Sequence, residues 1–160
     1  MKRKIIDSPI GRLLLGADDA GICMIRLLNP EEKVDEEHTC ALLEQAAQEL
    51  SEYFAGSRKA FGFPISLHGT PFERAVWQAL CGIPFGETRT YGQIAAQLGM
   101  PKGARAVGSA CSRNPVLIAV PCHREIAASG ALTGFAAGMP AKRTLLALEG
   151  FEMDHDRLKQ

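Results

Sequence analysis

Apolar residues near the start of the chain form short runs that alternate with turn residues. One run covers residues 10–16 and another covers residues 21–27, and Asp18-Asp19 lies between them together with glycines. Short apolar runs bounded by glycine and aspartate are typical of strands joined by tight turns. Residues 3–28 therefore predict two or three short strands.

Residues 39–54 follow a different period, with leucine, alanine and phenylalanine at helical spacing opposite glutamate and glutamine. This pattern predicts an amphipathic helix. Residues 61–67 are mostly apolar again and predict a strand, which Pro64 restricts to the edge of a sheet.

The pattern changes near residue 68, where we place a domain boundary. Thr70 and Pro71 suit the N-cap and the first position of a helix. Two further helices are predicted at 91–98 and 104–112. The expected domains are residues 1–67 and residues 68–160.

The two helices within residues 91–112, joined by a glycine-containing turn, have the outline of a helix-turn-helix. A recognition helix normally presents asparagine, glutamine or arginine to base edges, whereas the second helix here carries small residues and the single Arg105. Small residues allow close approach but cannot read a sequence, so the pattern argues against a transcription factor and indicates sequence-independent docking in a groove. The alternative is a helix that packs its small residues against a neighbour.

Charge supports a polyanionic partner through its distribution, because the formal net charge is zero. Residues 88–124 contain five basic side chains and no acidic one. Such an acid-free basic stretch is typical of a nucleic-acid-binding surface.

Composition narrows the class of protein further. The chain has 160 residues, 46% of them hydrophobic, which is enough for one domain or two small ones. No apolar run approaches the ~18–20 residues of a membrane span, and Asp7 and Pro9 interrupt any signal-peptide pattern, so we expect a cytoplasmic protein.

Five cysteines without a CxxC pair indicate reduced thiols. The set Cys23, His38, Cys40 and His68 matches no standard zinc spacing, and no metal is expected.

One cysteine stands where chemistry is expected. Residues 116–120 read as an apolar strand that ends at Pro121, and Cys122 follows at once. A lone buried cysteine is usually inert, but His123 and Arg124 are neighbours of the kind that favour a thiolate. Adjacent residues of a strand point to opposite faces, so His123 would act on Cys122 through a water, with Glu149 or Glu125 as the carboxylate behind it.

Here the chain resembles a known family, the O6-alkylguanine-DNA alkyltransferases, or methylated-DNA–protein-cysteine S-methyltransferases. The resemblance runs from about residue 68 to residue 151 and is weaker over residues 1–67. It implies an α+β fold, with an α/β ribonuclease-H-like N-terminal domain and a mostly helical C-terminal domain that carries the helix-turn-helix. The motifs are Pro121-Cys122-His123-Arg124, Arg105-Ala106-Val107-Gly108, Asn114-Pro115 and Leu145-Leu146-Ala147-Leu148-Glu149-Gly150.

The resemblance also implies an activity: repair of double-stranded DNA by moving an alkyl group from O6-alkylguanine, and from O4-alkylthymine, onto Cys122. The thioether product does not hydrolyse, so the protein is consumed, acts as a monomer and needs no cofactor. His123, a water and Glu149 would form a proton relay, and Asn114 would tie the active-site turn to the helix-turn-helix. The implied DNA-binding and nucleotide-flipping residues are Tyr91, Arg105, Ala106, Gly108 and Arg113, and the implied substrate-pocket residues are Cys111, Glu125, Phe135, Ala136 and Lys142.

Three residues depart from the family pattern. Glu125 replaces an apolar residue, Phe135 replaces a common tyrosine, and Ala137 replaces a frequent glycine. A carboxylate at 125 raises the pKa of a nearby thiol, and the missing phenol would slow transfer if it protonates the leaving guanine. These departures keep open an alkyltransferase-like damage sensor that binds lesions without efficient transfer. A thiol hydrolase is the other alternative, and it would need an oxyanion hole.

Overall fold

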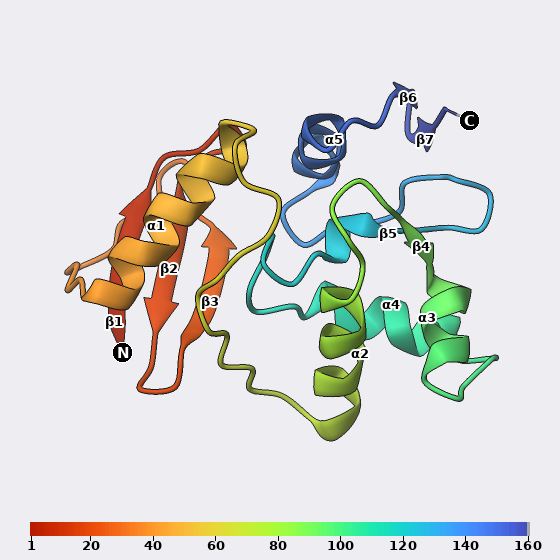
Figure 1. The fold of residues 1–160 in the computed structure, drawn as a ribbon, viewed down its shortest axis with the longest axis horizontal. Helices are drawn as coiled ribbons and strands as arrows, with labels where there is room; N and C mark the ends of the chain where they lie inside the picture. Colours follow the sequence, from red (N-terminus) through yellow and green to blue (C-terminus); the bar gives the residue numbers. More distant parts are fainter. Residues whose placement is uncertain (160) are drawn as a thin grey trace. The chain divides into compact units, whose positions relative to one another are not determined.

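The computed structural model describes residues 1–159, and their contacts divide the chain into two compact units. The first unit contains Met1–His68 together with Pro115–Leu117. The second contains Gly69–Asn114 and the chain from Ile118 onward. The chain therefore returns to the first unit for three residues, between the helix-turn-helix and Cys122. Figure 1 shows the elements of each unit.

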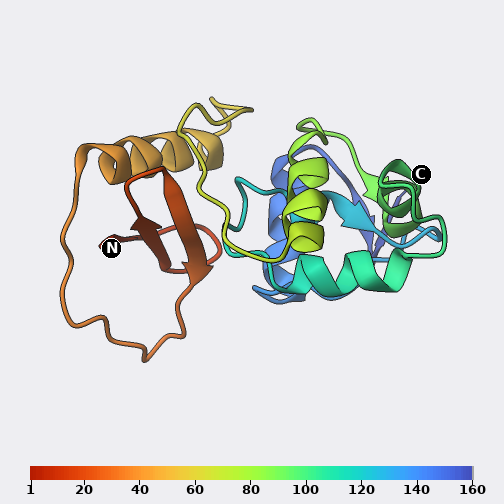
Figure 2. The ribbon, with the colours of Figure 1, turned by 90° about the horizontal axis from the view of Figure 1, so that it is seen from below.

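The first unit is a small antiparallel sheet covered by one helix. Its strands are β1 (Lys2–Ile6), β2 (Leu13–Ala17) and β3 (Ile22–Leu27), in that spatial order, and every residue of β2 is buried. Helix α1 (Ala41–Phe54) lies across one face of the sheet (Figures 1 and 2). The predicted strands and helix are thus confirmed: β2 is a continuous apolar run buried along its whole length, and α1 buries one face at helical spacing.

The strand expected over residues 61–67 is wrong. Only Ile65 pairs, as an isolated parallel bridge with Ile22, through Ile22 N–H to Pro64 O (2.8 Å) and Ser66 N–H to Ile22 O (2.8 Å). Pro64 has no N–H, so the pairing cannot extend along the edge. The contact also requires a glycine at position 21, where a Cβ would lie 2.7 Å from Pro64 O.

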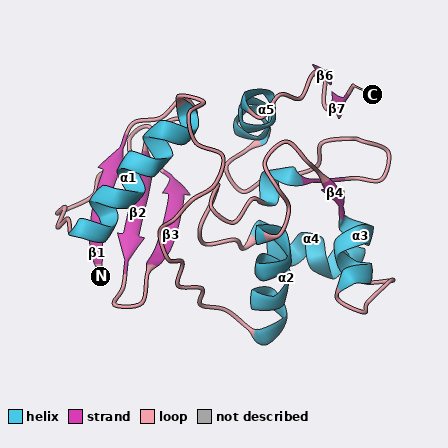
Figure 3. Ribbon diagram, viewed as in Figure 1, coloured by secondary structure: helices cyan, strands magenta, loops and turns pink. Residues whose placement is uncertain are grey.

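The second unit is mainly helical, with very short strands (Figure 3). Helix α2 begins with the expected cap: the Thr70 hydroxyl accepts from Glu73 N–H, and the Glu73 carboxylate accepts from Thr70 N–H. Helices α2, α3 and α4 pack on one another, and the buried Trp77 indole donates to Ala110 O at 2.9 Å. The helices are α2 (Pro71–Cys81), α3 (Tyr91–Gln97), α4 (Ala104–Ser112) and α5 (Met139–Leu148); the strand pairs are β4 (Arg89–Thr90) with β5 (Glu125–Ile126), parallel, and β6 (Met153–Asp154) with β7 (Arg157–Leu158), antiparallel.

The strand expected over residues 116–120 is also wrong. Val116 forms an isolated parallel bridge with Ile25, and the chain then turns at Ile118, whose φ of +72° lies in a region that a β-branched residue rarely adopts. The Asn114 side chain closes this loop by donating to Val120 O at 2.8 Å. Cys122 and His123 consequently lie in a 3₁₀ turn, Cys122–Arg124. The expectation that the two side chains point to opposite faces of a strand therefore does not apply.

The helices were also compared with the requirements of a membrane span. Within residues 1–159, no helix combines the length and the apolar character that crossing a bilayer requires.

Candidate active site

Cys122 is buried and held by one amide side chain. Its residue is 4% exposed, and the Asn114 Nδ2 donates to its Sγ at 3.1 Å while also holding Val120 O. Asn114 follows directly after the end of α4, so the amide links the helix-turn-helix to the cysteine turn. A hydrogen-bond donor at this distance favours the thiolate over the thiol.

His123 is completely buried and is oriented by Glu149. Its Nε2 lies 2.7 Å from Glu149 Oε2. A carboxylate only accepts, so Nε2 carries the hydrogen and Nδ1 keeps its lone pair. This Nδ1 is buried and has no hydrogen-bond partner among the described residues. Burial lowers the pKa of His123 against the opposing effect of Glu149, which leaves a neutral imidazole able to take a proton.

Glu149 lies at the C-terminal end of α5 and is satisfied on both oxygens. Arg124 donates to it through Nε (2.8 Å to Oε1) and Nη2 (3.0 Å to Oε2), and Gly86 N–H donates to Oε1 at 3.2 Å. Arg124 also donates to Ile83 O at 2.6 Å. The guanidinium therefore compensates the buried carboxylate, and the expectation that Arg124 favours the Cys122 thiolate is not supported by these contacts.

The thiol of Cys122 is protonated at rest. Burial raises its pKa to about 11, and this effect outweighs the hydrogen bond from Asn114 and the charge of Lys142, which both lower it. The sequence suggested a low-pKa cysteine, which the structure corrects. A reaction at Cys122 must therefore remove its proton to a base as it proceeds.

A second buried cluster lies under the same turn. The Cys111 thiol on α4 donates to Glu125 Oε1 at 2.7 Å, and Glu125 Oε2 has no partner among the described residues. Lys142 on α5 is fully buried and donates to Glu125 O (2.7 Å) and Thr133 O (3.1 Å). Burial raises the pKa of Glu125 to about 7, despite its contact with Cys111 and the charge of Lys142.

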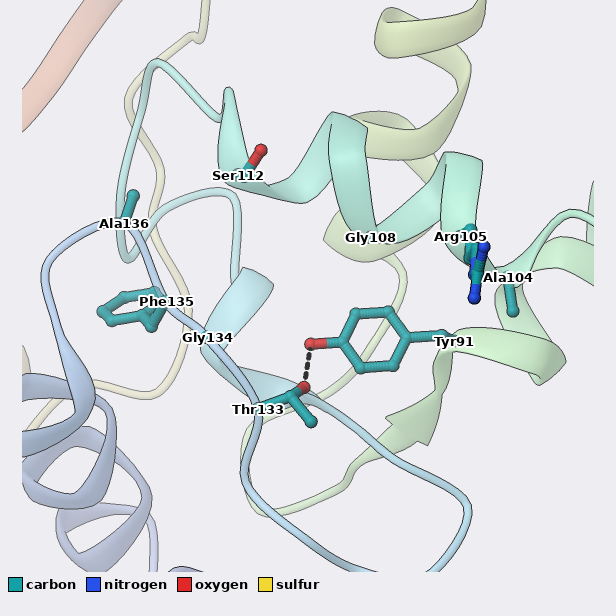
Figure 4. Close-up of a pocket in the computed structure, with 9 residues that line it drawn as sticks. All are labelled: Tyr91, Ala104, Arg105, Gly108, Ser112, Thr133, Gly134, Phe135 and Ala136. Carbon is teal, nitrogen blue, oxygen red and sulfur yellow. Dashed lines mark hydrogen bonds between the residues drawn. The ribbon is translucent and has the colours of Figure 1, made fainter.

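A cavity of about 590 Å³ opens between α3, α4 and the loop before α5 (Figure 4). Its walls are largely apolar, and its size accommodates a purine base. The ring of Phe135, which forms part of its wall, packs edge-on against the His123 ring with 6.4 Å between the ring centres, so this wall contacts the residue that follows Cys122. The lining residues are Tyr91, Ala104, Arg105, Gly108, Ser112, Thr133, Gly134, Phe135 and Ala136.

The outer face of α4 is built from small side chains and two arginines. Arg105 lies at the cavity and is exposed, with no hydrogen bond or ion pair to any residue in 1–159. Arg113, in contrast, is paired with Glu73 and donates to Ser109 Oγ at 2.9 Å. Ala106 is exposed beside Arg105, whereas Val107 is buried. Arg105 is therefore the cation that α4 leaves available to a ligand.

The described residues contain no group of three or more histidine, cysteine or acidic side chains that could hold a metal. His38 pairs with Glu36 and His68 pairs with Asp18, at 2.8 and 2.7 Å. The four residues Cys23, His38, Cys40 and His68 are not brought together as such a group.

Comparisons with known proteins match both units. The model of the 6-O-methylguanine DNA methyltransferase DNA binding domain matches residues 71–151, and that of the ribonuclease-like domain of the same family matches residues 1–67. The chain belongs to the 6-O-methylguanine DNA methyltransferase family. The α+β fold class expected from the sequence is thereby confirmed.

Relatives of this family match nearly the whole chain. A methylated-DNA–protein-cysteine methyltransferase from Methanosarcina acetivorans is 45% identical over 150 residues, which cover 91% of this chain and 96% of the relative. The protein of the same name from Mycobacterium tuberculosis H37Rv is 45% identical over 149 residues, 91% of this chain and 90% of that protein. The crystal structure of Mycobacterium tuberculosis OGT in complex with DNA superposes with a TM-score of 0.85 at 44% identity, covering 93% of this chain and 92% of that one.

Within this member of the family, the structure separates the expected pocket residues into two sets. Phe135 and Ala136 line the cavity, whereas Cys111, Glu125 and Lys142 form the buried cluster beneath the cysteine turn and are not among its lining residues. Four lining residues were missed: Ala104, Ser112, Thr133 and Gly134. Thr133-Gly134 directly precedes Phe135, so adjacency to that residue was the signal available in the sequence.

Proposed function

We propose that Cys122 accepts the methyl or other alkyl group of O6-alkylguanine in double-stranded DNA. Family membership makes the chain a methyltransferase of the methylated-DNA–protein-cysteine class. The observation that carries the residue assignment is the buried Cys122 thiol, which accepts from Asn114 and directly precedes His123. His123 is paired with Glu149, and its ring packs against Phe135 in the wall of the purine-sized cavity. Lesions at O4 of thymine are expected to react at the same sulfur.

The buried contacts support a defined path for the proton. The unprotonated Nδ1 of His123 takes the thiol proton, through one water, while Glu149 stabilises the imidazolium that forms. The sulfur attacks the alkyl carbon, the carbon–oxygen bond breaks, and guanine leaves with the bonding electrons. The guanine anion takes up one proton, which balances the proton that the thiol gave to His123. Asn114 Nδ2 and the charge of Lys142 stabilise the sulfur anion during this step.

The product explains why one protein molecule serves one lesion. A thioether has no good leaving group for water to displace, so Cys122 stays alkylated. The transferred group comes from the DNA itself, and the reaction as written requires only side chains of this chain and one water.

The face of α4 supports the proposed encounter with DNA. A damaged base is shielded inside the duplex and must rotate out to reach the sulfur of Cys122, a residue that is 4% exposed. Small residues such as Ala106 and Gly108 allow α4 to approach a minor groove closely, and the unpaired Arg105 can occupy the vacated place in the stack. Tyr91 lines the cavity, and we assign it the role of pushing on the target phosphate and helping to rotate the nucleotide out. Arg113 is committed to Glu73, so we assign it a smaller part in DNA binding. One monomer carries every residue of this scheme.

Stoichiometric transfer with peptide mapping tests the proposal. The protein is incubated with a duplex that contains one O6-methylguanine, digested, and analysed by mass spectrometry. We expect one methyl group per protein on the Cys122 peptide, none with Cys122→Ala, and full transfer with Cys111→Ala, the matched buried-thiol control.

The other outcomes point to the rival functions. Tight lesion binding without a methylated cysteine supports damage sensing, and repeated turnover supports a hydrolase. Arg105→Ala should weaken binding of the lesion duplex about tenfold and leave reaction with the free alkylated base unchanged. An equal loss with the free base would contradict the assignment of Arg105 to the duplex.

A further inference from the structure

One hydrogen bond in the cavity wall has no part in the scheme above. The hydroxyl oxygens of Tyr91 and Thr133 lie 2.5 Å apart, and both residues line the cavity (Figure 4). The Tyr91 ring lies beside Gly108 of α4, where an added Cβ would make an ordinary van der Waals contact of 3.7 Å with its Cδ1 and Cε1 atoms. The phenol ring therefore lies next to α4, and Thr133 holds its oxygen.

Thr133 is itself held in place by the protein around it. Its carbonyl accepts from the fully buried Lys142, whose Nζ also binds Glu125 O. The preceding Leu132 is buried in a small core with Ile126 and Leu146, and its N–H donates to Asp156 O at 2.6 Å. Contacts of this kind on both sides fix the backbone from which the Thr133 hydroxyl projects.

We infer that Thr133 is a positioning residue for alkyl transfer: its hydroxyl donates to the phenol oxygen of Tyr91 and leaves the phenolic hydrogen directed at the bound base. This inference rests on the proposed function. Each of the two hydroxyls carries one hydrogen, so when Thr133 donates, the phenol hydrogen is free for the substrate. Tyr91 donates a hydrogen bond to the departing guanine and keeps its proton, so the proton balance of the reaction is unchanged.

Two observations make this hydroxyl pair the relevant one. Position 135 is a phenylalanine, so that wall of the cavity offers no phenol. The chain has two tyrosines, and the other, Tyr53, is buried among the residues of the first unit. Tyr91 is therefore the phenol that can reach the base.

The electrostatics of Tyr91 favour the same direction of donation. Burial raises the pKa of Tyr91 to about 12, and the hydrogen bond from Thr133 opposes that rise. A phenol that accepts a hydrogen bond becomes a better donor, because bonded hydroxyls polarise one another. Thr133 thus restores donor strength that burial removes from Tyr91.

The test separates orientation from binding. Thr133→Val removes the hydroxyl and keeps the shape, and Thr133→Ser keeps the hydroxyl. The rate of methyl transfer is measured in single turnovers at saturating lesion duplex, and duplex affinity is measured separately. We expect Thr133→Val to slow transfer roughly 3- to 10-fold, the factor that one net hydrogen bond supplies, with less than a twofold change in affinity. Thr133→Ser should restore most of the rate.

A cycle with Tyr91→Phe tests whether Thr133 acts through Tyr91. In the Tyr91→Phe background the Thr133→Val change should cost no further rate. An equal slowing in that background overturns the inference, as does a Thr133→Ser protein as slow as Thr133→Val, or an unchanged rate in Thr133→Val. If Thr133→Val does not fold, as judged by thermal unfolding, Thr133→Ala is used in the same cycle.

Failure of this inference is distinguishable from failure of the proposed function. If Cys122 is not the acceptor, the unmodified protein leaves no methyl group on the Cys122 peptide. If only Thr133 is misassigned, the unmodified protein is methylated at Cys122 and the Thr133 variants match its rate.

Discussion

Two buried carboxyls flank the Cys122 turn, and their surroundings differ sharply. Glu149 and Glu125 are 5% and 0% exposed. Glu149 accepts hydrogen bonds from His123, from two nitrogens of Arg124 and from Gly86 N–H. Glu125 accepts one, from the Cys111 thiol, and its second oxygen has no partner among residues 1–159.

The difference shows that burial makes the charged form of both carboxyls unfavourable, and that the groups in contact with each carboxyl decide whether it stays ionised. Desolvation penalises the charge of both groups. At Glu149 a bidentate guanidinium compensates that charge, so the carboxylate can orient His123. At Glu125 a thiol and a lysine committed to two carbonyls are weaker compensation, and the pKa of Glu125 rises to about 7. Glu149 therefore supports His123 as a base, whereas Glu125 binds a proton near neutral pH.

The largest effect is expected from Glu149→Gln. The change leaves Arg124 buried without its counter-charge and removes the carboxylate that stabilises protonated His123. Breaking a buried pair costs about 3–5 kcal/mol of unfolding free energy, and loss of general base support lowers the transfer rate by about 10²–10⁴-fold. Denaturant unfolding and single-turnover transfer measure the two effects.

The same substitution at the other carboxyl, Glu125→Gln, is the matched control for the rate. Ionised Glu125 raises the pKa of Cys122, so the amide should leave transfer at pH 8 equal or a few-fold faster. Equal rate losses in the two variants would break the comparison.

The next effect concerns stability against pH. The pKa of Glu125 is raised from its ordinary 4.5 to about 7, so the folded protein binds a proton that the unfolded chain has released. Protonated Glu125 therefore contributes to the free energy of unfolding at low pH. This contribution falls by about 3 kcal/mol in total as the pH rises from about 4.5 to 7.

Urea unfolding of the native protein and of Glu125→Gln at pH 5 and pH 8 checks this. The native protein should lose more stability than the variant between the two pH values. The lowered pKa of His123 acts in the opposite direction, but it is common to both proteins and cancels in the difference. Parallel pH profiles would show that Glu125 is ionised throughout.

The smallest effect is expected from Cys111→Ala. It removes the one hydrogen bond to the Glu125 side chain, a contact that lowers the pKa of Glu125. We expect a loss of about 1 kcal/mol at pH 8, a smaller loss at pH 5 where Glu125 is protonated, and an upward shift of the Glu125 transition. Cys81→Ala, on the exposed surface of α2, is the control and should change neither. A loss that does not depend on pH would indicate that packing of the thiol, and not its hydrogen bond, stabilises the protein.

The sequence predicted the elements whose signals are local. Helices α1, α2, α3 and α4 were expected within a few residues of their observed bounds, because their apolar periods and the Thr70 cap lie inside each segment. The apolar segments 61–67 and 116–120 misled the prediction, because each pairs only through one isolated bridge, Ile65 with Ile22 and Val116 with Ile25, and forms no strand. Pairing and chain reversal there depend on Pro64, Asn114 and residues distant in sequence.

The sequence by itself determined the family, the Cys-His-Arg motif and the helix of small residues, since these are carried by residue types in order. Only the tertiary structure decided which acid serves His123, that Arg124 compensates that acid, and that Cys122 rests as a thiol. It also brought Thr133 to Tyr91 across 42 positions of sequence. The reason is physical: pKa values and hydrogen-bond partners depend on desolvation and on charges a few ångströms away, and folding alone assembles those neighbours.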